Sequence, residues 1–242
     1  MPIAVAGSTL STGADTYSSA IESAENYTRW VLADFRPYFG KRILEVGLGH
    51  GGYRRFLPPD SDYLGLDIDA DCVARAAARN PDDRFLVADV TDPRLAQRIT
   101  GVVPDTVLCF NVLEHIEADV DAVANLSRLL APGGHILIFV PAFQALYSDL
   151  DRLAGHVRRY TKADIQRFAV TGIEMREYRY FNAIGGIGWF VNRALRHSSL
   201  NSASVNSQIQ FFDRYIVPLA KTVDLLTHRF FGQSLLCVLR KQ

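Results

Sequence analysis

The stretch Arg42-Ile43-Leu44-Glu45-Val46-Gly47-Leu48-Gly49-His50-Gly51-Gly52 decides the expected fold of this chain. Its apolar first half predicts a buried strand, and its glycines predict a tight turn into a helix where a nucleotide-like ligand can approach the backbone. Twenty residues past Gly47, Asp67 ends a second apolar run. At that separation a carboxylate can accept hydrogen bonds from both hydroxyls of a ribose. The two features together predict a ligand derived from adenosine.

The glycines fit two known spacings, which point to different cofactors. Gly47 and Gly49 are common to both spacings. Gly52 completes the dinucleotide spacing G-x-G-x-x-G, whereas Gly51 completes the spacing G-x-G-x-G of S-adenosylmethionine enzymes. The turn alone therefore leaves a nicotinamide cofactor and S-adenosylmethionine both open.

A third apolar run, residues 84–88, also ends in a carboxylate, at Asp89. At the end of a strand next to that of Asp67, Asp89 would accept a hydrogen bond from the adenine amine, while the Val90 backbone N–H serves a ring nitrogen. A pyrophosphate cofactor gains nothing from this added negative charge. The third run therefore favours S-adenosylmethionine.

Five motifs in order along residues 40–141 resemble those of the class I S-adenosylmethionine-dependent methyltransferases. They are Leu44-Glu45-Val46-Gly47-x-Gly49-x-Gly51, Asp67, Ala88-Asp89-Val90, Asn111-Val112-Leu113-Glu114-His115-Ile116 and Leu130-Ala131-Pro132-Gly133-Gly134. The last third of the chain matches more loosely, through Tyr147, Asp151 and the segment 155–161. The resemblance implies a Rossmann-like α/β fold: a seven-stranded, mostly parallel sheet with helices on both faces and an antiparallel last strand.

Alternating apolar runs and helical patterns indicate the same architecture. We expect strands near 42–47, 63–68, 84–89, 105–111, 134–140, 173–181 and 234–239, and helices over 71–79, 120–130 and 161–170. Residues 1–40 are expected to form a helical lead-in or cap. Residues 41–242 are expected to form the methyltransferase domain, with a helical, aromatic-rich insertion at about 183–231.

Composition narrows the class of partner. The 242 residues are 48% hydrophobic, and 26 basic residues balance 26 acidic ones, so no basic field exists to attract a nucleic acid. Cys72, Cys109 and Cys237 are far apart and lack metal-ligand spacing, which predicts no metal and a reducing, cytoplasmic location. The N-terminus has no basic flank typical of a secretion signal, and no apolar stretch is long enough to span a membrane.

The resemblance implies a set of cofactor-binding residues. It places Glu45, Gly47 and Gly49 around the methionine part of S-adenosylmethionine, Asp67 on the ribose, and Ile68 against the adenine. Asp89 and Val90 fall at the adenine edge, while Asn111 and Leu113 line the methionine side through their carbonyl groups. Tyr27 is a candidate to close over the cofactor from the N-terminal segment. The structural alternative for both aspartates is that they only cap the helices that follow.

Candidate catalytic residues are His156, His115 and Tyr160. His156 lies in a polar loop after the fifth strand and has a pKa range suited to proton removal, so it is the first candidate for a general base. It can equally be a loop histidine that orders the helix after Thr161. His115 is the weaker candidate, because the resemblance makes Glu114-His115 a recurrent structural element.

Candidate acceptor-binding residues follow the fifth strand or lie in the insertion. Arg158 or Arg159 could hold an acceptor carboxylate or phosphate in a fork. Tyr147 and Tyr160 are candidates to line the path of the methyl group, and Trp189 is the candidate from the insertion. For each tyrosine, packing alone explains its presence as well.

The resulting hypothesis is a methyltransferase that acts on a small molecule, at oxygen or nitrogen rather than carbon, with secondary metabolism as one setting. It uses S-adenosylmethionine, releases S-adenosylhomocysteine, and works as a monomer or homodimer. One alternative is a lipid-like acceptor met at a membrane surface through the aromatic insertion. A nicotinamide-dependent oxidoreductase and a non-catalytic interaction protein are the others.

Overall fold

The computed structural model describes residues 23–49, 51–192 and 203–242 of the chain. Its centre is a sheet with strands in the order β3-β2-β1-β4-β5-β7-β6. The strands are β1 (Arg42–Val46), β2 (Asp62–Asp67), β3 (Arg84–Val87), β4 (Thr106–Phe110), β5 (His135–Pro141), β6 (Ile173–Phe181) and β7 (Ser234–Lys241). The expected strands are thus all present, with boundaries shifted by one or two residues.

Strand direction follows the expected pattern. Strands β1 to β5 pair in parallel. Strand β7 runs antiparallel to both of its neighbours, β5 and β6. The Rossmann-like class and the antiparallel last strand are therefore confirmed. Because parallel strands end at one edge, the segments after β1, β2, β3 and β4 meet at the same side of the sheet, which is where open α/β sheets bind ligands.

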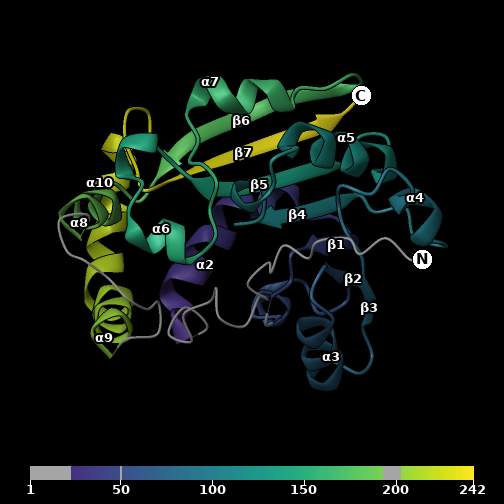
Figure 1. Ribbon diagram of the computed structural model, residues 1–242, viewed down its shortest axis with the longest axis horizontal. Helices are drawn as coiled ribbons and strands as arrows, with labels where there is room; N and C mark the ends of the chain where they lie inside the picture. Colours follow the sequence, from purple (N-terminus) through teal and green to yellow (C-terminus); the bar gives the residue numbers. More distant parts are fainter. Residues whose placement is uncertain (1–22, 50, 193–202) are drawn as a thin grey trace, which may run out of the picture.

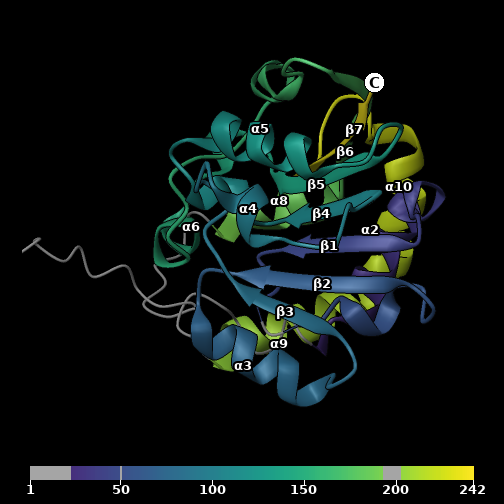
Figure 2. The same ribbon diagram turned by 90° about the vertical axis from the view of Figure 1, so that its right-hand side faces the viewer.

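Alternation along the strands builds a separate core on each face of the sheet. One core joins Leu44 and Val46 of β1 to the buried side of α5 (Asp119–Leu129). The other joins Ile43 of β1 to α2 (Glu25–Phe35) and α10 (Val217–Thr227). Figures 1 and 2 show α5 on one face and α2 with α10 on the opposite face. Helices on both faces bury strands that are apolar on both sides.

The segment before the first strand packs against the main sheet. In α2, Trp30, Val31, Leu32 and Phe35 are buried, and Phe35 stacks on Phe110 of β4 at 4.8 Å between ring centroids. The described part of the expected 1–40 cap is thus helical and shares a core with the sheet. Residues 1–22 of that expectation lie outside the described residues.

The helices after β2 and β5 begin at side-chain caps. Asp69 caps α3 (Ala70–Arg79) by accepting hydrogen bonds from the backbone N–H groups of Asp71 and Cys72. Thr161 and Asp164 form a capping box at the expected start of the helix over 161–170, but this helix is shorter than expected: α7 spans Lys162–Ile165 and continues as the 3₁₀ turn η5 (Gln166–Phe168). A box fixes where a helix begins, whereas packing decides where it ends.

The expected insertion is helical over most of its described residues, and residues 228–231 form a turn and loop after its last helix. It contains α8 (Ala183–Asn192), α9 (Ala203–Phe211), the π-helical η6 (Phe212–Ile216) and α10. Residues 193–202 of the insertion lie outside the described residues. The remaining short elements are η1 (Arg36–Tyr38), η2 (Arg54–Phe56), α4 (Leu95–Arg98), η3 (Leu113–His115), η4 (Gln144–Leu146) and α6 (Asp149–Leu153).

Candidate active site

The glycine turn after β1 requires glycine at three positions. Gly47, Gly49 and Gly51 have φ angles of 69°, 52° and 73°, a region that side chains with a Cβ rarely adopt. At Gly47 a Cβ would also lie 2.3 Å from the Val112 side chain. By contrast, a Cβ at Gly52 would meet nothing within 4 Å. The backbone therefore uses the spacing G-x-G-x-G, which favours S-adenosylmethionine over a dinucleotide.

Asp67 lies at the carboxyl end of β2, directly beside this turn. Its side chain is buried, and its two oxygens accept hydrogen bonds from the backbone N–H groups of Gly49 at 2.8 Å and Asp69 at 2.9 Å. Each carboxylate oxygen has a second lone pair for a ligand hydroxyl. The next residue, Ile68, leaves 64% of its surface exposed at the same edge. An acidic acceptor thus sits next to an uncovered apolar side chain, as a nucleoside requires.

Glu45 lies in β1, two residues before Gly47, and its side chain is buried. One of its oxygens accepts a hydrogen bond from the Tyr63 hydroxyl at 2.7 Å, and the other has no partner among the described residues. Burial raises the pKa of Glu45 to about 7, against the hydrogen bond from Tyr63. A carboxyl group with an unused acceptor fits a ligand donor such as the ammonium group of a methionine moiety.

Asp89 and Val90 follow β3, next to β2 in the sheet. Asp89 is half-buried, and one of its oxygens already accepts hydrogen bonds from the backbone and hydroxyl of Thr91. Val90 is buried, with its carbonyl bound by Asn125 of α5. Asp89 thus closes a local turn with Thr91 and does not cap α4, whose N-cap is Arg94, and its other oxygen is the one left for an adenine amine.

Asn111 and Leu113 follow β4 at the same edge. Asn111 adopts a φ of 53°, an uncommon conformation for a residue with a Cβ that recurs at functional sites. Leu113 is fully buried, and its carbonyl accepts a hydrogen bond from the Tyr160 hydroxyl at 2.8 Å. The carbonyl assigned to the cofactor at Leu113 is thus already used by the protein, whereas the strained backbone of Asn111 fits that role.

A second group of polar side chains converges on Asp151 of α6, which is fully buried. Arg159 donates two hydrogen bonds to its carboxylate, at 2.8 and 3.0 Å. Ser148 and the Trp189 indole N–H also donate to it, and His156 Nδ1 lies 2.8 Å from it. Burial opposes ionisation of Asp151, but the bonds from His156 and Arg159 outweigh it and lower its pKa to about 2.

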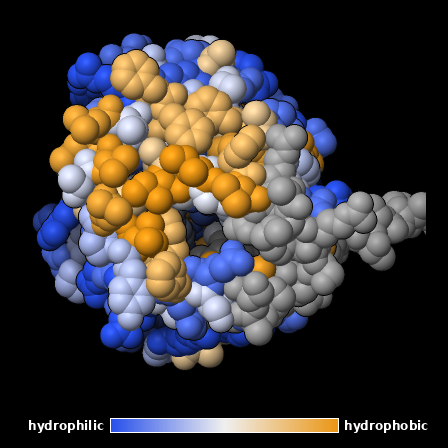
Figure 3. Space-filling model, turned by 90° about the vertical axis from the view of Figure 1, so that its left-hand side faces the viewer, coloured by the Kyte–Doolittle hydropathy of each residue, from blue (hydrophilic) through white to orange (hydrophobic). Residues whose placement is uncertain are grey.

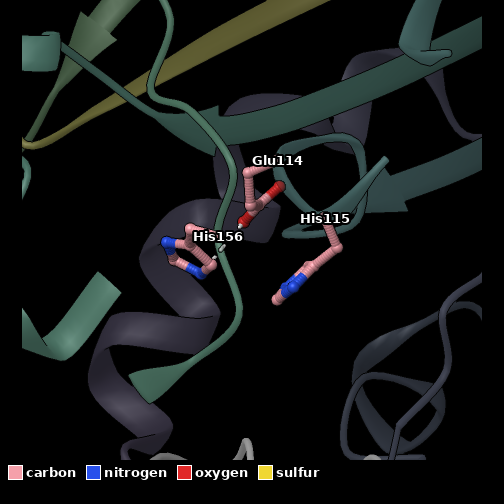
Figure 4. A group of neighbouring side chains, drawn as sticks. All are labelled: Glu114, His115 and His156. Carbon is pink, nitrogen blue, oxygen red and sulfur yellow. Dashed lines mark ion pairs between the residues drawn. The ribbon is translucent and has the colours of Figure 1, made fainter. Parts of the chain in front are cut away.

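This arrangement determines how His156 presents its ring. With Nδ1 donating to Asp151, the lone pair of Nε2 faces Glu114, whose oxygen lies 3.9 Å away. The ring of His115 meets that of His156 edge-on at 4.8 Å between centroids. Figure 4 shows Glu114 and His115 leaving the same short turn, with His156 supplied by the facing loop.

Glu114 and His115 differ sharply in their surroundings. Glu114 is fully buried, and neither carboxylate oxygen has a hydrogen-bond partner among the described residues. Burial raises the pKa of Glu114 to about 7, opposed by the charges of His156 and Arg159. His115 keeps an exposed face, while desolvation on its other side and the neighbouring His156 lower its pKa.

Three predicted site residues have structural roles instead. Tyr160 is fully buried, and its hydroxyl bonds the Leu113 carbonyl and the Asp119 carboxylate, so it is not available to a methyl path. Burial raises its pKa well above the usual range. Arg158 is paired with Glu117 and Asp119, and Arg159 with Asp151, so neither guanidinium forms an open fork for an acceptor.

Tyr27 and Tyr147 are also tied to the protein. The Tyr27 ring packs edge-on against Trp30, Phe181 and Phe212, and burial raises its pKa to about 12. The Tyr27 ring therefore packs in the aromatic core beside α2 and does not close over the glycine turn. Tyr147 donates its hydroxyl proton to the His156 carbonyl at 2.7 Å and so stabilises the histidine loop.

Sequence reasoning gave Asp151 and Glu114 no role in the site. The pattern Ser148-x-x-Asp151, which the structure shows to be a capping box, was an available signal for the start of α6 but not for the burial of Asp151. Glu114 carried no separate signal, because a motif does not show whether a carboxylate is buried or paired.

The fold and site define the class as a doubly wound α/β protein whose glycine turn and buried Asp67 meet at the carboxyl edge of its sheet. Residues 44–136 match the family model described as Methyltransferase domain. This part of the chain is therefore a methyltransferase domain, and the chain has the fold of class I S-adenosylmethionine-dependent methyltransferases. The match sets the dinucleotide alternative aside.

Curated relatives match the same region of the chain. A ubiquinone biosynthesis O-methyltransferase from Aliivibrio fischeri is 27% identical over 110 residues, which cover 44% of this chain and 47% of the relative. A trans-aconitate 2-methyltransferase from Acidovorax sp. is 30% identical over 104 residues, 42% of this chain and 38% of the relative. The chain thus spans about half the length of the curated relatives it matches.

Solved structures extend the similarity of fold to nearly the whole chain. The N-methyltransferase NodS from Bradyrhizobium japonicum, determined with S-adenosylhomocysteine, superposes with a TM-score of 0.54 at 15% sequence identity. The superposition covers 94% of this chain and 98% of that one. At this identity the likeness establishes the fold alone. Among the described residues, no helix is both long and apolar enough to cross a membrane.

Proposed function

We propose that this chain transfers a methyl group from S-adenosylmethionine to an oxygen or nitrogen atom of a small molecule. The observation that carries the proposal is the edge formed after β1 and β2, where the glycine turn and the buried Asp67 carboxylate are held together by the Gly49 N–H. This edge lies within the region that matches the methyltransferase domain. The names of the relatives, which include O- and N-methyltransferases, support both kinds of acceptor atom.

Each residue of this edge has a role in cofactor binding under the proposal. Asp67 accepts hydrogen bonds from the ribose hydroxyls, and Ile68 packs against the adenine. Asp89 accepts a hydrogen bond from the adenine amine, and the Val90 N–H donates one to a ring nitrogen. Glu45 accepts from the ammonium group, and Asn111 offers its carbonyl to the methionine part. The cofactor supplies an activated methyl group when bound, so the protein mainly aligns the acceptor and excludes water.

His156 is the proposed proton acceptor when the methyl acceptor is a hydroxyl. Asp151 fixes the Nδ1–H tautomer of His156, so Nε2 carries the lone pair on the side of Glu114 and His115. Trp189, bonded to the same Asp151, brings the insertion to this site. The Asp151–His156 pair therefore links the proposed base to the segment that would recognise the acceptor.

Cofactor binding is tested by Asp67→Ala. Loss of charge-assisted hydrogen bonds should weaken binding of S-adenosylhomocysteine by roughly 1 to 3 kcal/mol, or about 5- to 150-fold, in isothermal titration calorimetry. Asp71→Ala, an exposed position in the first turn of α3, is the matched control and should bind normally. Unchanged affinity in Asp67→Ala, or tight binding of NADH alone, would contradict the proposal.

Methyl transfer is tested with S-adenosylmethionine carrying a labelled methyl group and a pool of small metabolites. A labelled product identified by mass spectrometry supports the enzyme. With that acceptor, His156→Ala should slow single-turnover transfer far more than it weakens cofactor binding. A chain that binds the cofactor but labels no product would instead be the non-catalytic alternative.

A lipid-like acceptor at a membrane surface is a second candidate, favoured by one observation. Figure 3 shows apolar side chains gathered on the face that carries the insertion helices. The exposed apolar residues of α8, η6 and α10 with the turn after it are Ile187, Phe190, Val191, Tyr215, Leu219, Leu225, Leu226 and Phe230. An apolar hollow of about 370 Å³ between η4 and α8 adjoins the same face.

Co-sedimentation with anionic phospholipid vesicles tests this candidate. The chain should pellet with the vesicles, and Leu226→Asp should reduce the bound fraction, because a charge on the contact face costs free energy in the interface. Asp71→Ala serves as the control on a different surface. No binding to vesicles would remove this candidate and leave the soluble acceptor.

A further inference from the structure

Three side chains near the proposed acceptor site have the composition of a metal site. Glu114 and His115 belong to η3, and His156 belongs to the loop after α6. One potential ligand atom from each lies within 4.8 Å of the others. Figure 4 shows how the two segments bring the carboxylate and the two imidazoles together. We propose that these three residues bind a single divalent transition-metal cation of the Zn²⁺ type.

The strongest support is the carboxylate of Glu114. It is fully buried, yet neither of its oxygens has a partner among the described residues, and one of them faces His156 Nε2 at 3.9 Å. That separation is too long for a hydrogen bond. A buried carboxylate without a partner is costly, and a bound cation is one of the few groups that removes the cost. The two unpartnered oxygens of Glu114 are therefore available to coordinate a cation.

His156 has the outer partner that a metal-binding histidine usually has. His156 Nδ1 is bound to Asp151 at 2.8 Å, which leaves Nε2 free to coordinate. The backbone of Gly155 lies beside the His115 ring. A metal-bound histidine almost always donates its second ring N–H to a carboxylate or a carbonyl, because this fixes its tautomer and orientation. Asp151 is itself held by Arg159 and Ser148, so the outer partner of His156 is rigid.

The spacing of the three groups suits coordination after a small movement. Ligand atoms about 2.1 Å from a tetrahedral zinc ion lie roughly 3.4 Å apart. The distance of 3.9 Å between Glu114 and His156 is close to that value. His115 is exposed, so its ring is free to rotate toward the other two. Two imidazoles and one carboxylate form a ligand set used by zinc and by non-haem iron.

A site with three protein ligands leaves a coordination position open. The exposed side of the group is the side of His115, so this position faces the solvent-accessible region where the proposed acceptor would enter. If the chain is a methyltransferase as proposed, a cation bound by these three residues would also bind the acceptor oxygen and favour loss of its proton. This role of the cation rests on the proposed function, whereas the binding of the cation does not. Because coordination uses Nε2, His156 would then act as a ligand in place of a base.

The test is calorimetric titration of Zn²⁺ into the full chain, after chelation, dialysis and removal of any affinity tag. We expect one cation per chain, and a visible absorption spectrum typical of nitrogen and oxygen ligands when Co²⁺ is used as the probe. His115→Ala, His156→Ala and Glu114→Gln should each weaken Zn²⁺ binding by at least about tenfold, since each removes one ligand. His228→Ala, at the end of α10, is the matched control and should bind as the unmodified chain does.

Two outcomes would overturn the proposal. One is the absence of stoichiometric Zn²⁺ binding to the unmodified chain. The other is binding that survives both Glu114→Gln and His115→Ala, because the cation would then lie elsewhere. Circular dichroism checks that each variant is folded, and the exposed position of His115 makes its variant the one least prone to unfolding. Titration of S-adenosylhomocysteine into the same chains tests the proposed function separately, since none of the three residues is assigned to the cofactor.

Discussion

At the scale of single residues, Asp151 is the buried charge on which the acceptor side of the site depends. Its carboxylate holds Arg159, which is 4% exposed, and orients His156. A substitution here leaves a buried guanidinium without its counter-charge. Local sequence would not indicate such a cost, because Asp151 lies only three residues into a short surface helix.

We expect Asp151→Ala to lower the free energy of unfolding by about 3 to 5 kcal/mol, the usual effect of removing one partner of a buried ion pair. Asp149→Ala in the same helix removes only a surface pair with Arg152 and should cost less than about 1 kcal/mol. Urea denaturation of both variants measures the difference. Equal effects of the two substitutions would show that Arg159 finds another partner.

Glu45 makes the stability of the ligand-free chain depend on pH. Burial raises its pKa from 4.5 to about 7, so the folded chain holds a proton that the unfolded chain has already released between these values. The stability due to the protonated form is complete below about pH 4.5 and is lost as pH rises through 7. Each pKa unit corresponds to about 1.4 kcal/mol.

Glu45→Gln should therefore be about as stable as the unmodified chain at pH 5 and more stable by about 1 to 3 kcal/mol at pH 8, without ligand. The amide can still accept the hydrogen bond from Tyr63. Urea denaturation at the two pH values measures this difference, and the exposed Glu25→Gln in α2 is the control. A stability difference that does not change with pH would contradict the assignment of a raised pKa to Glu45.

At the scale of elements, the capping box of α7 positions the chain after the histidine loop. Thr161 and Asp164 each bond the backbone of the other. Thr161→Ala should cost about 1 kcal/mol of stability. The double variant Thr161→Ala, Asp164→Ala should cost less than the sum of the single variants, because both substitutions break the same box. Thermal unfolding measures all three, and strict additivity would show that the two bonds are independent.

At the scale of the whole molecule, α2 and the sheet share one core, so they should unfold together. Phe35 is fully buried against Phe110. Phe35→Ala should lower the free energy of unfolding by about 3 to 5 kcal/mol, since it leaves a cavity under the sheet. The measurement is urea unfolding followed by circular dichroism and by fluorescence of Trp30 in α2, in a Trp189→Phe background. Separate transitions for the two signals would show that residues before β1 form an independent unit.

The sequence predicted the architecture well because its signals are local. Apolar runs marked each strand, an alanine-rich segment marked α3, and Thr161 marked the start of α7. The glycine turn and Asp67 are also adjacent in the fold for a local reason: consecutive parallel strands place their carboxyl ends at one edge of the sheet. The end of the helix after Thr161 was wrong, because packing and not the cap decides where a helix stops.

By itself, the sequence determined the Rossmann-like sheet, the glycine turn that includes Gly47 and Gly49, and the carboxylate at Asp67. Only the tertiary structure decided that Tyr160 is buried, that Arg159 is paired, and that Asp151, His156 and Glu114 meet. The physical reason is that backbone conformation and periodicity are properties of neighbouring residues. Burial and ion pairing, in contrast, depend on segments that are distant along the chain and meet only when the sheet and its loops are assembled.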